Sequence, residues 1–448
     1  MFSKILIANR GEIAVRIIRA CKEMGIATVA VFSQADRDAL HVSLADESYC
    51  IGPAPAAKSY LNQDAIITCA LLSGAQAVHP GYGLLSENAS FSRKCAQSGL
   101  TFIGPDGDTI DRMGDKDQAR RTMARAGMPV TPGSGVIESP EQARRWAEKI
   151  GFPLLVKARS GGGGRGIRKV TQQDALEGAV IAAQAEAQSA FGDGAVYLEK
   201  FVSPAKHVEM QMLCDNFGHV ICLGERECSM QRKNQKVLEE SPCAAISPEL
   251  RQKMMRCAID ALSAIGYRGL GTIEFLLQGD QFYFMEMNTR LQVEHPVTEM
   301  RTGVDLVKWQ IRAAAGLPLD FTQQDVRFSG HAIECRICAE DPRRNFAPSC
   351  GTISLLHVPG GPWVRFDTAL YQGYAIPPFY DSMIAKLIVC APTREEAVRK
   401  LNSALCEMVV EGVCHNRELL LDLIDSPAFL DGTYHTGTLA QLCEAGGQ

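Results

Sequence analysis

The sequence predicts a multidomain protein of the α/β and α+β classes that opens with a doubly wound parallel sheet and closes with a mixed domain. With 448 residues the chain exceeds one ordinary domain, so two to four packed units are expected. A strand pattern at residues 4–9, a helical repeat at 13–21 closed by Gly25, and a second strand pattern at 28–33 follow one another. This strand, helix, strand order is typical of a doubly wound parallel sheet.

The composition argues against several classes of function. Charged residues make up 22% of the chain and the net charge is −5, so no basic field favours nucleic acid or an anionic membrane. No apolar run reaches the roughly 18 residues that cross a bilayer, and the N-terminus lacks a signal peptide's cleavage region. The 16 cysteines are scattered and are expected to be reduced, and Cys335 with Cys338 has no second pair to complete a zinc site. We therefore expect a cytoplasmic protein.

Residues 74–88 are expected to be a strand that runs into a loop. Because ligands bind at the carboxyl ends of parallel strands, Tyr82 and Glu87 in this loop are candidate site residues. The alternative is a Gly-Pro turn that merely displays the two side chains.

The middle of the chain contains a glycine-rich loop. Helical spacing runs over 111–126 with Lys116 inside it, and a domain boundary is expected at 131–133. Beyond it, two strand patterns flank the glycine run at 160–166, and Lys157 ends the first of them. A cation beside bare backbone N–H groups suits a phosphate ligand, although a glycine run can also be a simple hinge.

Polar residues recur in the strands that follow. Residues 196–202 form a strand pattern with Glu199, and a hairpin begins near His207, which could equally be an ordinary core histidine. The run 225–242 is rich in basic residues, for which a solvated face is the default interpretation. Lys236 in this run could instead neutralise charge in an active site.

The stretch 271–298 contains the strongest chemical signal. It is a hairpin pattern, and if its loop is 279–281, Glu274 lies directly opposite Glu286 on one sheet face. If the extended backbone continues, the same face carries Asn288, Arg290, Gln292 and Glu294. Two opposed carboxylates and an amide oxygen are hard ligands suited to Mg²⁺, whereas the alternative is an exposed strand face with solvated charges.

The last third of the chain is expected to form a mixed domain. A helix is predicted over 303–316, and a strand beginning at residue 331 places Glu334 and Arg336 in step on one face. An arginine there can hold a developing oxyanion without titrating. Interrupted strands over 363–390 and helices over 393–410 and 415–425 complete the chain.

Several segments together resemble one family. HPGYGLLSEN, KARSGGGGRGIR, RECSMQRKNQKVLEESP, EMNTRLQVEHPVTE and ECRICAEDP resemble the biotin carboxylases, which are ATP-grasp enzymes, and the resemblance covers essentially the whole chain. It implies an N-terminal α/β domain at 1–112, an ATP-grasp domain at 113–330 with a mobile lid near 131–203, and a C-terminal domain at 331–448.

The resemblance also implies roles for particular residues. ATP would be bound by Lys116, Lys157, Gly163, Gly164, Glu199, Lys200, Phe201, Val202, His207, Gln231, Asn234, Glu274 and Glu286. Mg²⁺ or Mn²⁺ would be held by Glu274, Glu286 and Asn288, bicarbonate by Lys236, Arg290, Val293 and Glu294, and biotin by Arg336 and Tyr82. The catalytic residues would be Lys236, Arg290, Glu294 and Arg336.

The activity implied is that of an ATP-dependent ligase. Bicarbonate and ATP would give carboxyphosphate, whose CO₂ is captured by biotin, as in the first half-reaction of acetyl-CoA carboxylase in fatty acid synthesis. The chain has no biotinylation motif, so a separate biotin carboxyl carrier protein and carboxyltransferase subunits are expected partners. The alternatives are a different ATP-grasp ligase, a non-catalytic nucleotide-sensing subunit, or the detached carboxylase subunit of a pyruvate or other acyl-CoA carboxylase.

Some positions depart from the family pattern. Asn234 stands where some members have His, Ser160 replaces a lid glycine, and Cys338 stands where Asn is usual. A homodimer is expected, with contacts near Arg19, Glu23 and Arg365; its strength is left open by the differing residues Pro362 and Trp363. No catalytic charge is lost, so the reaction class is unaffected.

Overall fold

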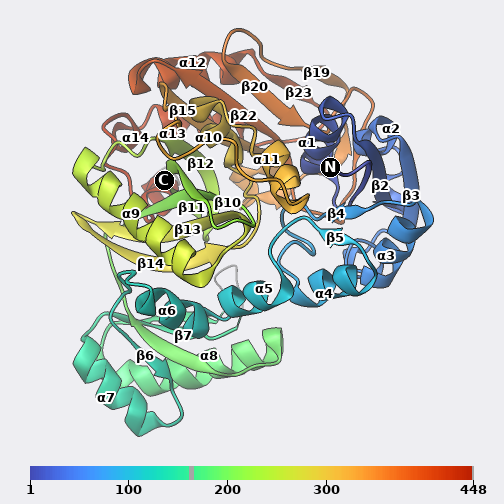
Figure 1. The fold of residues 1–448 in the computed structure, drawn as a ribbon. Coiled ribbons are helices and arrows are strands. Elements are labelled where there is room, and N and C mark those ends of the chain that lie inside the picture. The colour runs from blue at the N-terminus through green and yellow to red at the C-terminus, as the bar shows by residue number, and fades with distance from the viewer. Residues whose placement is uncertain (161–165, 446–448) are drawn as a thin grey trace.

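The computed structural model describes residues 1–160 and 166–445, and its N-terminal part is a five-stranded parallel sheet (Figure 1). Ile7 packs with Ile17 on one face of the sheet, and Leu6 packs with Phe91 on the other. The sheet is therefore covered on both faces, as predicted. In spatial order its strands are β3 (Glu47–Gly52), β2 (Ala27–Ser33), β1 (Lys4–Ile7), β4 (Ala77–His79) and β5 (Thr101–Phe102), with helices α1 (Gly11–Glu23), α2 (Leu40–Leu44), α3 (Gln63–Leu72) and α4 (Ala89–Gln97).

The single helix predicted over 111–126 is wrong. The structure has α5 (Gly107–Gly114) and α6 (Lys116–Arg125), separated by one extended residue, Asp115. The Asp115 side chain accepts a hydrogen bond from the backbone N–H of Gln118, so it caps α6. Aspartate prefers this position to a helix interior, which is why the helix breaks there. Lys116 is consequently the first residue of α6.

The segment predicted as a lid is a compact α/β unit. A four-stranded antiparallel sheet has the order β6 (Gly133–Val136), β9 (Val196–Lys200), β7 (Leu154–Ala158) and β8 (Ile167–Val170), and α7 (Pro140–Ile150) and α8 (Leu176–Phe191) pack against it. Figure 1 shows this unit, in teal and light green, extending away from the other sheets. The predicted phosphate-binding Gly163 and Gly164 lie outside the described residues. Closure of the lid stays a prediction.

One eight-stranded sheet forms the centre of the molecule. Its order is β14 (Gln281–Asn288), β13 (Gly269–Gln278), β10 (Lys206–Cys214), β11 (Val220–Arg232), β12 (Gln235–Ser241), β15 (His331–Cys338), β22 (Met383–Ala391) and β20 (Val364–Thr368). All neighbours in it are antiparallel. The sheet continues from β12 to β15, so strands from both sides of residue 330 share it. The predicted domain boundaries stay a prediction.

The central hairpin has the predicted pairing but a different loop. Gln278 pairs with Gln281, which leaves a two-residue loop, not the expected three. A bulge in β14 adds one residue before Glu286, and this restores the predicted pairing of Glu274 with Glu286. The expectation of extended backbone as far as Glu294 is wrong, because β14 ends at Asn288 and α10 (His295–Thr302) follows.

The remaining elements cover the central sheet and form small additions to it. Helices α9 (Pro248–Ile265), α11 (Leu306–Ala314), α12 (Arg394–Glu407), α13 (Arg417–Ile424), α14 (Pro427–Leu430) and α15 (Thr438–Ala445) lie around it. Three two-stranded sheets pair β16 (Glu340–Asp341) with β17 (Ala347–Pro348), β18 (Gly351–Thr352) with β21 (Ala375–Ile376), and β19 (Leu355–His357) with β23 (Val409–Glu411). Among the described residues, no helix combines the length and apolar character needed to span a membrane.

Candidate active site

A cavity of about 1190 Å³ lies between the lid unit and the central sheet. Strands β10 to β15, the loop after β14 and the lid unit supply most of its wall, and Asp381, Thr436 and Ala440 complete it. The predicted site residues that line it are Lys157, Phe201, Val202, His207, Gln231, Asn234, Lys236, Glu274, Glu286, Asn288, Arg290, Val293, Glu294 and Arg336. The predicted residues Lys116, Glu199, Lys200 and Tyr82 are not part of this lining.

Glu294 is held among cations. It occupies the residue before α10 and is 2% exposed. Its two carboxylate oxygens accept hydrogen bonds from Lys236 Nζ at 2.6 Å and from Arg336 Nη2 at 3.0 Å. Burial alone would raise the pKa of Glu294, but Lys236, Arg336 and Arg226 lower that pKa well below its usual range. At neutral pH Glu294 is thus an ionised carboxylate.

Lys236 connects three acids. Its Nζ atom lies 2.6 Å from Glu294, 2.7 Å from Glu209 and 2.9 Å from Glu274. Burial would lower the pKa of Lys236, but the three carboxylates outweigh it and raise that pKa well above its usual value. The ammonium group is therefore a fixed positive charge at the centre of the cavity floor.

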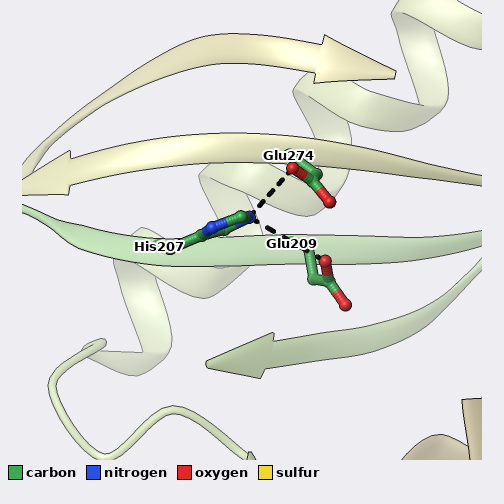
Figure 2. Close-up of side chains that lie close together, drawn as sticks. All are labelled: His207, Glu209 and Glu274. Atoms are coloured by element: carbon green, nitrogen blue, oxygen red, sulfur yellow. Dashed lines mark ion pairs between the residues drawn. The ribbon is translucent and has the colours of Figure 1, made fainter. Parts of the chain in front are cut away.

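Glu209 belongs to the site but was not predicted. It lies on β10, is fully buried, and accepts a hydrogen bond at 2.6 Å from the equally buried Arg226. Figure 2 shows Glu209 beside His207 and Glu274. The Nε2 atom of His207 lies 3.0 Å from the Oε2 atom of Glu274. Residues two apart on a strand share a face, so the spacing of His207 and Glu209 was the sequence signal that could have placed Glu209 beside His207.

The predicted metal ligands converge on one wall of the cavity. Glu274 lies directly opposite Glu286, and Asn288 donates a hydrogen bond from Nδ2 to Glu274 Oε1 at 2.8 Å. Glu286 is more open and reaches Lys116 Nζ at 3.3 Å. These oxygen donors are hard ligands, so the residues present fit Mg²⁺.

A second possible ligand set overlaps with this one. His207, Glu209 and Glu274 can each place a ligand atom within 4.8 Å of the others. Glu209, however, is already engaged by Arg226 and Lys236. The open Glu286 carboxylate makes the predicted set better suited to a cation that also contacts a phosphate.

The predicted nucleotide-binding residues form linked pairs. Lys157 Nζ contacts Glu199 Oε2 at 2.6 Å, and Gln231 Nε2 lies 2.7 Å from His207 Nδ1. Lys200 turns toward the lid backbone and donates to the carbonyl of Phe152 at 3.1 Å. Its side chain therefore supports the lid and does not line the cavity.

Asn234 lies in the tight turn between β11 and β12, at the edge of the cavity. Lys233 and Asn234 have φ angles of 48° and 66°, and Arg232 pairs with Gln235 across the turn. Asparagine and histidine both tolerate this left-handed conformation better than most residues, so the turn is compatible with either residue at this position.

A smaller cavity of about 480 Å³ lies next to the first and shares Arg290, Val293 and Arg336 with it. Tyr82 lines this second cavity and donates a hydrogen bond to Glu12. Glu87, the other candidate from the same loop, accepts from Arg290 Nε at 2.8 Å. Both candidates of that loop therefore lie beside the predicted catalytic arginines.

The other departures and the predicted dimer residues do not line either cavity. Cys338 and its partner in the C-x-x-C motif, Cys335, are buried free thiols. Ser160 donates to Asp193 within the lid at 2.7 Å. The predicted dimer residues Arg19, Glu23 and Arg365 line one shallow surface hollow of about 310 Å³.

Comparison with known proteins gives consistent matches along the chain. Three family descriptions match: biotin carboxylase N-terminal domain at 1–110, carbamoyl-phosphate synthase L chain ATP-binding domain at 115–322, and biotin carboxylase C-terminal domain at 334–441. The biotin carboxylase of Haemophilus influenzae is 55% identical over 428 residues, which are 94% of this chain and 95% of that protein.

Two solved structures are close in shape. The biotin carboxylase domain dimer of the Hydrogenobacter thermophilus 2-oxoglutarate carboxylase, in complex with MgADP, ADP and bicarbonate, has a TM-score of 0.95 and 50% identity over 98% of each chain. A biotin carboxylase–β,γ-ATP complex from Campylobacter jejuni has a TM-score of 0.96 and 46% identity, covering 98% of this chain and 99% of that one.

Proposed function

This chain belongs to the biotin carboxylase family, and from that premise we propose that it carboxylates biotin carried by a separate protein, using ATP and bicarbonate. The observation that carries the proposal is the contact of one buried base, Glu294, with two cations, Lys236 and Arg336, in a cavity that also holds the candidate metal ligands. An ionised base beside fixed positive charges suits the binding and deprotonation of a small anion.

The residues divide into roles that follow from their chemistry. Lys236 and Arg290 bind bicarbonate, and Glu294 takes its proton, so that a bicarbonate oxygen attacks the γ-phosphorus and ADP leaves. Glu294 is a weak base, and the proton transfer is feasible because the same cations also lower the pKa of the bound bicarbonate. Mg²⁺ held by Glu274, Glu286 and Asn288 would neutralise charge on the phosphates.

The second half of the reaction uses the neighbouring cavity. Carboxyphosphate divides into CO₂ and phosphate, phosphate takes the proton of the biotin ureido nitrogen, and this nitrogen attacks the carbon of CO₂. Arg336 lies at the junction of the two cavities, where it can stabilise the negative charge on the ureido oxygen. Tyr82 forms part of the wall beside it.

The finer assignments are also proposals. We infer an ATP-dependent ligase that serves acetyl-CoA carboxylase with a biotin carboxyl carrier protein and carboxyltransferase subunits, and that acts as a homodimer in the cytoplasm. The family resemblance supports this, and the 16 free cysteines suit a reducing compartment. The match to a 2-oxoglutarate carboxylase domain favours a second candidate, in which the chain serves a carboxylase of keto acids.

The test is ADP release with Mg²⁺, ATP and bicarbonate, with and without free biotin, for the wild type and Glu294→Gln. We expect biotin to stimulate ADP release and the substitution to abolish the stimulation. ADP release that depends on neither biotin nor bicarbonate would leave an ATP-grasp enzyme with a different substrate.

A further inference from the structure

We propose that Glu239 positions Arg336 for the biotin half of the reaction, an inference that rests on the function proposed above. Glu239 lies on β12, is fully buried, and accepts a hydrogen bond from Arg336 Nε at 2.7 Å. Arg336 Nη2 donates to Glu294 at 3.0 Å. Two carboxylates thus hold two different nitrogens of one planar guanidinium, which fixes both its place and its plane.

This arrangement leaves one nitrogen of Arg336 for the substrate. Among the described residues, none accepts a hydrogen bond from Nη1, and Arg336 lines both cavities. The two N–H bonds of Nη1, with the second N–H of Nη2, are consequently the donors available to an oxygen of the ligand. Without Glu239, Nε would lose its acceptor, and the guanidinium could rotate toward Glu294 and pair with both of its oxygens.

A bulge in β12 explains how one strand positions both halves of the site. Gln231 pairs with Lys236 and Met230 with Leu238, so Val237 is an extra residue in β12. A one-residue bulge changes which residues share a face, and it brings Glu239 onto the same side as Lys236. Lys236 then orients Glu294 while Glu239 orients Arg336. Glu240 points to the opposite side, where it contacts His331.

The neighbouring acid, Glu334, supplies a matched control. It pairs directly with Glu239 across β12 and β15, and within the described part of the chain neither of its buried oxygens has a hydrogen-bond partner. Two opposed buried carboxylates are held together at least cost when one is protonated. Burial raises the pKa of Glu239 to about 7 although Arg336 opposes this shift, and the pKa of Glu334 is raised as well. The proton therefore belongs on Glu334, which has no hydrogen-bonded cation among the described residues. Burial is the main reason that the pKa of Glu334 is raised well above its usual range. Glu334 is thus a neutral acid that Gln can replace.

The experiment compares Glu239→Leu, Glu239→Gln and Glu334→Gln in the whole protein. The measurements are kcat and KM for free biotin in ADP release, and the Kd of MgATP by calorimetry. Glu239→Leu should lower the biotin-stimulated kcat at least about tenfold, as expected when a catalytic group is misplaced. Glu239→Gln retains an acceptor and should lose less, whereas Glu334→Gln should stay close to wild type. The Kd of MgATP should be unchanged in all three.

Equal losses of biotin-stimulated kcat in Glu239→Gln and Glu334→Gln would overturn the proposal. Any buried acid at this pair of positions would then have the same effect, and the contact of Glu239 with Arg336 would have no special role. A crystal structure of Glu239→Leu tests the inference apart from activity. A guanidinium of Arg336 displaced toward Glu294 supports it, and one that stays in place overturns it. Absence of biotin stimulation in the wild type would instead count against the proposed function, and the crystal structure would still decide the role of Glu239.

Discussion

The Nζ atom of Lys236 lies 2.6 Å from a carboxylate oxygen of Glu294, whose side chain is buried, while the side chain of Lys236 keeps 11% of its surface exposed. Glu294 is the residue before α10 and Lys236 lies near the start of β12, so the contact joins two segments that are 58 residues apart in sequence. The same ammonium group also neutralises Glu209 and Glu274. Its removal should therefore affect the charge of the whole cavity floor.

The substitution Lys236→Met should lower bicarbonate-dependent ADP release by about a hundredfold or more, as for loss of one charge-stabilising group in other enzymes. It should also change the pH profile. In the wild type the pKa of Glu294 is well below its usual range despite burial, so the base stays ionised down to acidic pH. Without Lys236 the largest of the contributions that lower this pKa is lost, so the pKa rises, and activity should fall as the pH decreases from neutral.

The measurement is kcat/KM for bicarbonate between pH 6 and 9. Lys233→Met is the control, because Lys233 lines the same cavity and no described carboxylate forms an ion pair with it. The control should keep the wild-type pH profile. A Lys236→Met profile parallel to that of the wild type would show that Lys236 does not set the charge of Glu294.

The route to Glu294 shows how far the sequence alone could lead. The alternation of polar residues predicted that Glu286 and Asn288 share a face with Glu274, and the register confirms it. The predicted loop was one residue too long, and the bulge in β14 restored the pairing of Glu274 with Glu286. No spacing rule could predict this compensation. The alternation also placed Glu294 on this face, but Glu294 enters the cavity from the turn before α10, not from a strand. Its role as the base came from the family resemblance.

The acids that sequence reasoning missed share a physical cause. Glu209 and Glu239 lie on strands whose two faces are both buried, so the hydrophobic alternation that marks an inward face is absent. Their partners, Arg226 and Arg336, lie on other strands, and only the register of the sheet reveals the pairing. Composition and spacing describe one strand at a time and cannot predict contacts of this kind.

The substitution Glu286→Gln should raise the Mg²⁺ concentration needed for half-maximal ADP release at least about tenfold, because a metal ligand loses its charge. Glu286 is partly open to the cavity and pairs only loosely with Lys116, at 3.3 Å. The fold should therefore be unaffected. Chelation by EDTA should stop ADP release in the wild type, and added Mg²⁺ should restore it.

The control for this prediction is Glu87→Gln. Glu87 is exposed to a similar degree as Glu286, but it contacts Arg290 and no candidate metal ligand. Its Mg²⁺ requirement should match the wild type. An unchanged Mg²⁺ requirement in Glu286→Gln would remove Glu286 from the metal site.

The substitution Glu240→Gln should destabilise the protein by about 3–5 kcal/mol, the usual cost of breaking a buried ion pair. Glu240 is fully buried and accepts hydrogen bonds from His331 at 2.5 Å, Arg394 at 2.8 Å and Tyr434 at 2.6 Å. Burial raises its pKa, but His331 and Arg394 outweigh burial and lower the pKa to about 2. The exposed Glu395→Gln, which loses only a surface pair with Arg399, should cost less than about 1 kcal/mol.

The pH dependence follows from the direction of that shift. A carboxylate whose folded pKa is lowered from 4.5 to about 2 stabilises the fold above pH 4.5, and this stabilisation is lost as the pH falls toward 2. Denaturant unfolding at pH 7, 5 and 3 should show the difference between wild type and Glu240→Gln decreasing only at the lowest pH. A constant difference would mean that the Glu240 charge is not what stabilises this region.

The turn at Asn234 allows its conformation and its side chain to be tested separately. Asn234 has a φ of 66°, a conformation that glycine adopts freely and a β-branched residue does not. Asn234→Gly should therefore keep the wild-type melting temperature, whereas Asn234→Val should be destabilised by about 1–2 kcal/mol through backbone strain. If the side chain binds nucleotide, as predicted from the family, Asn234→Gly should still raise the KM for MgATP severalfold. A wild-type KM in Asn234→Gly, together with a raised KM in Asn234→Val, would show that this residue acts on the cavity only through the shape of the turn.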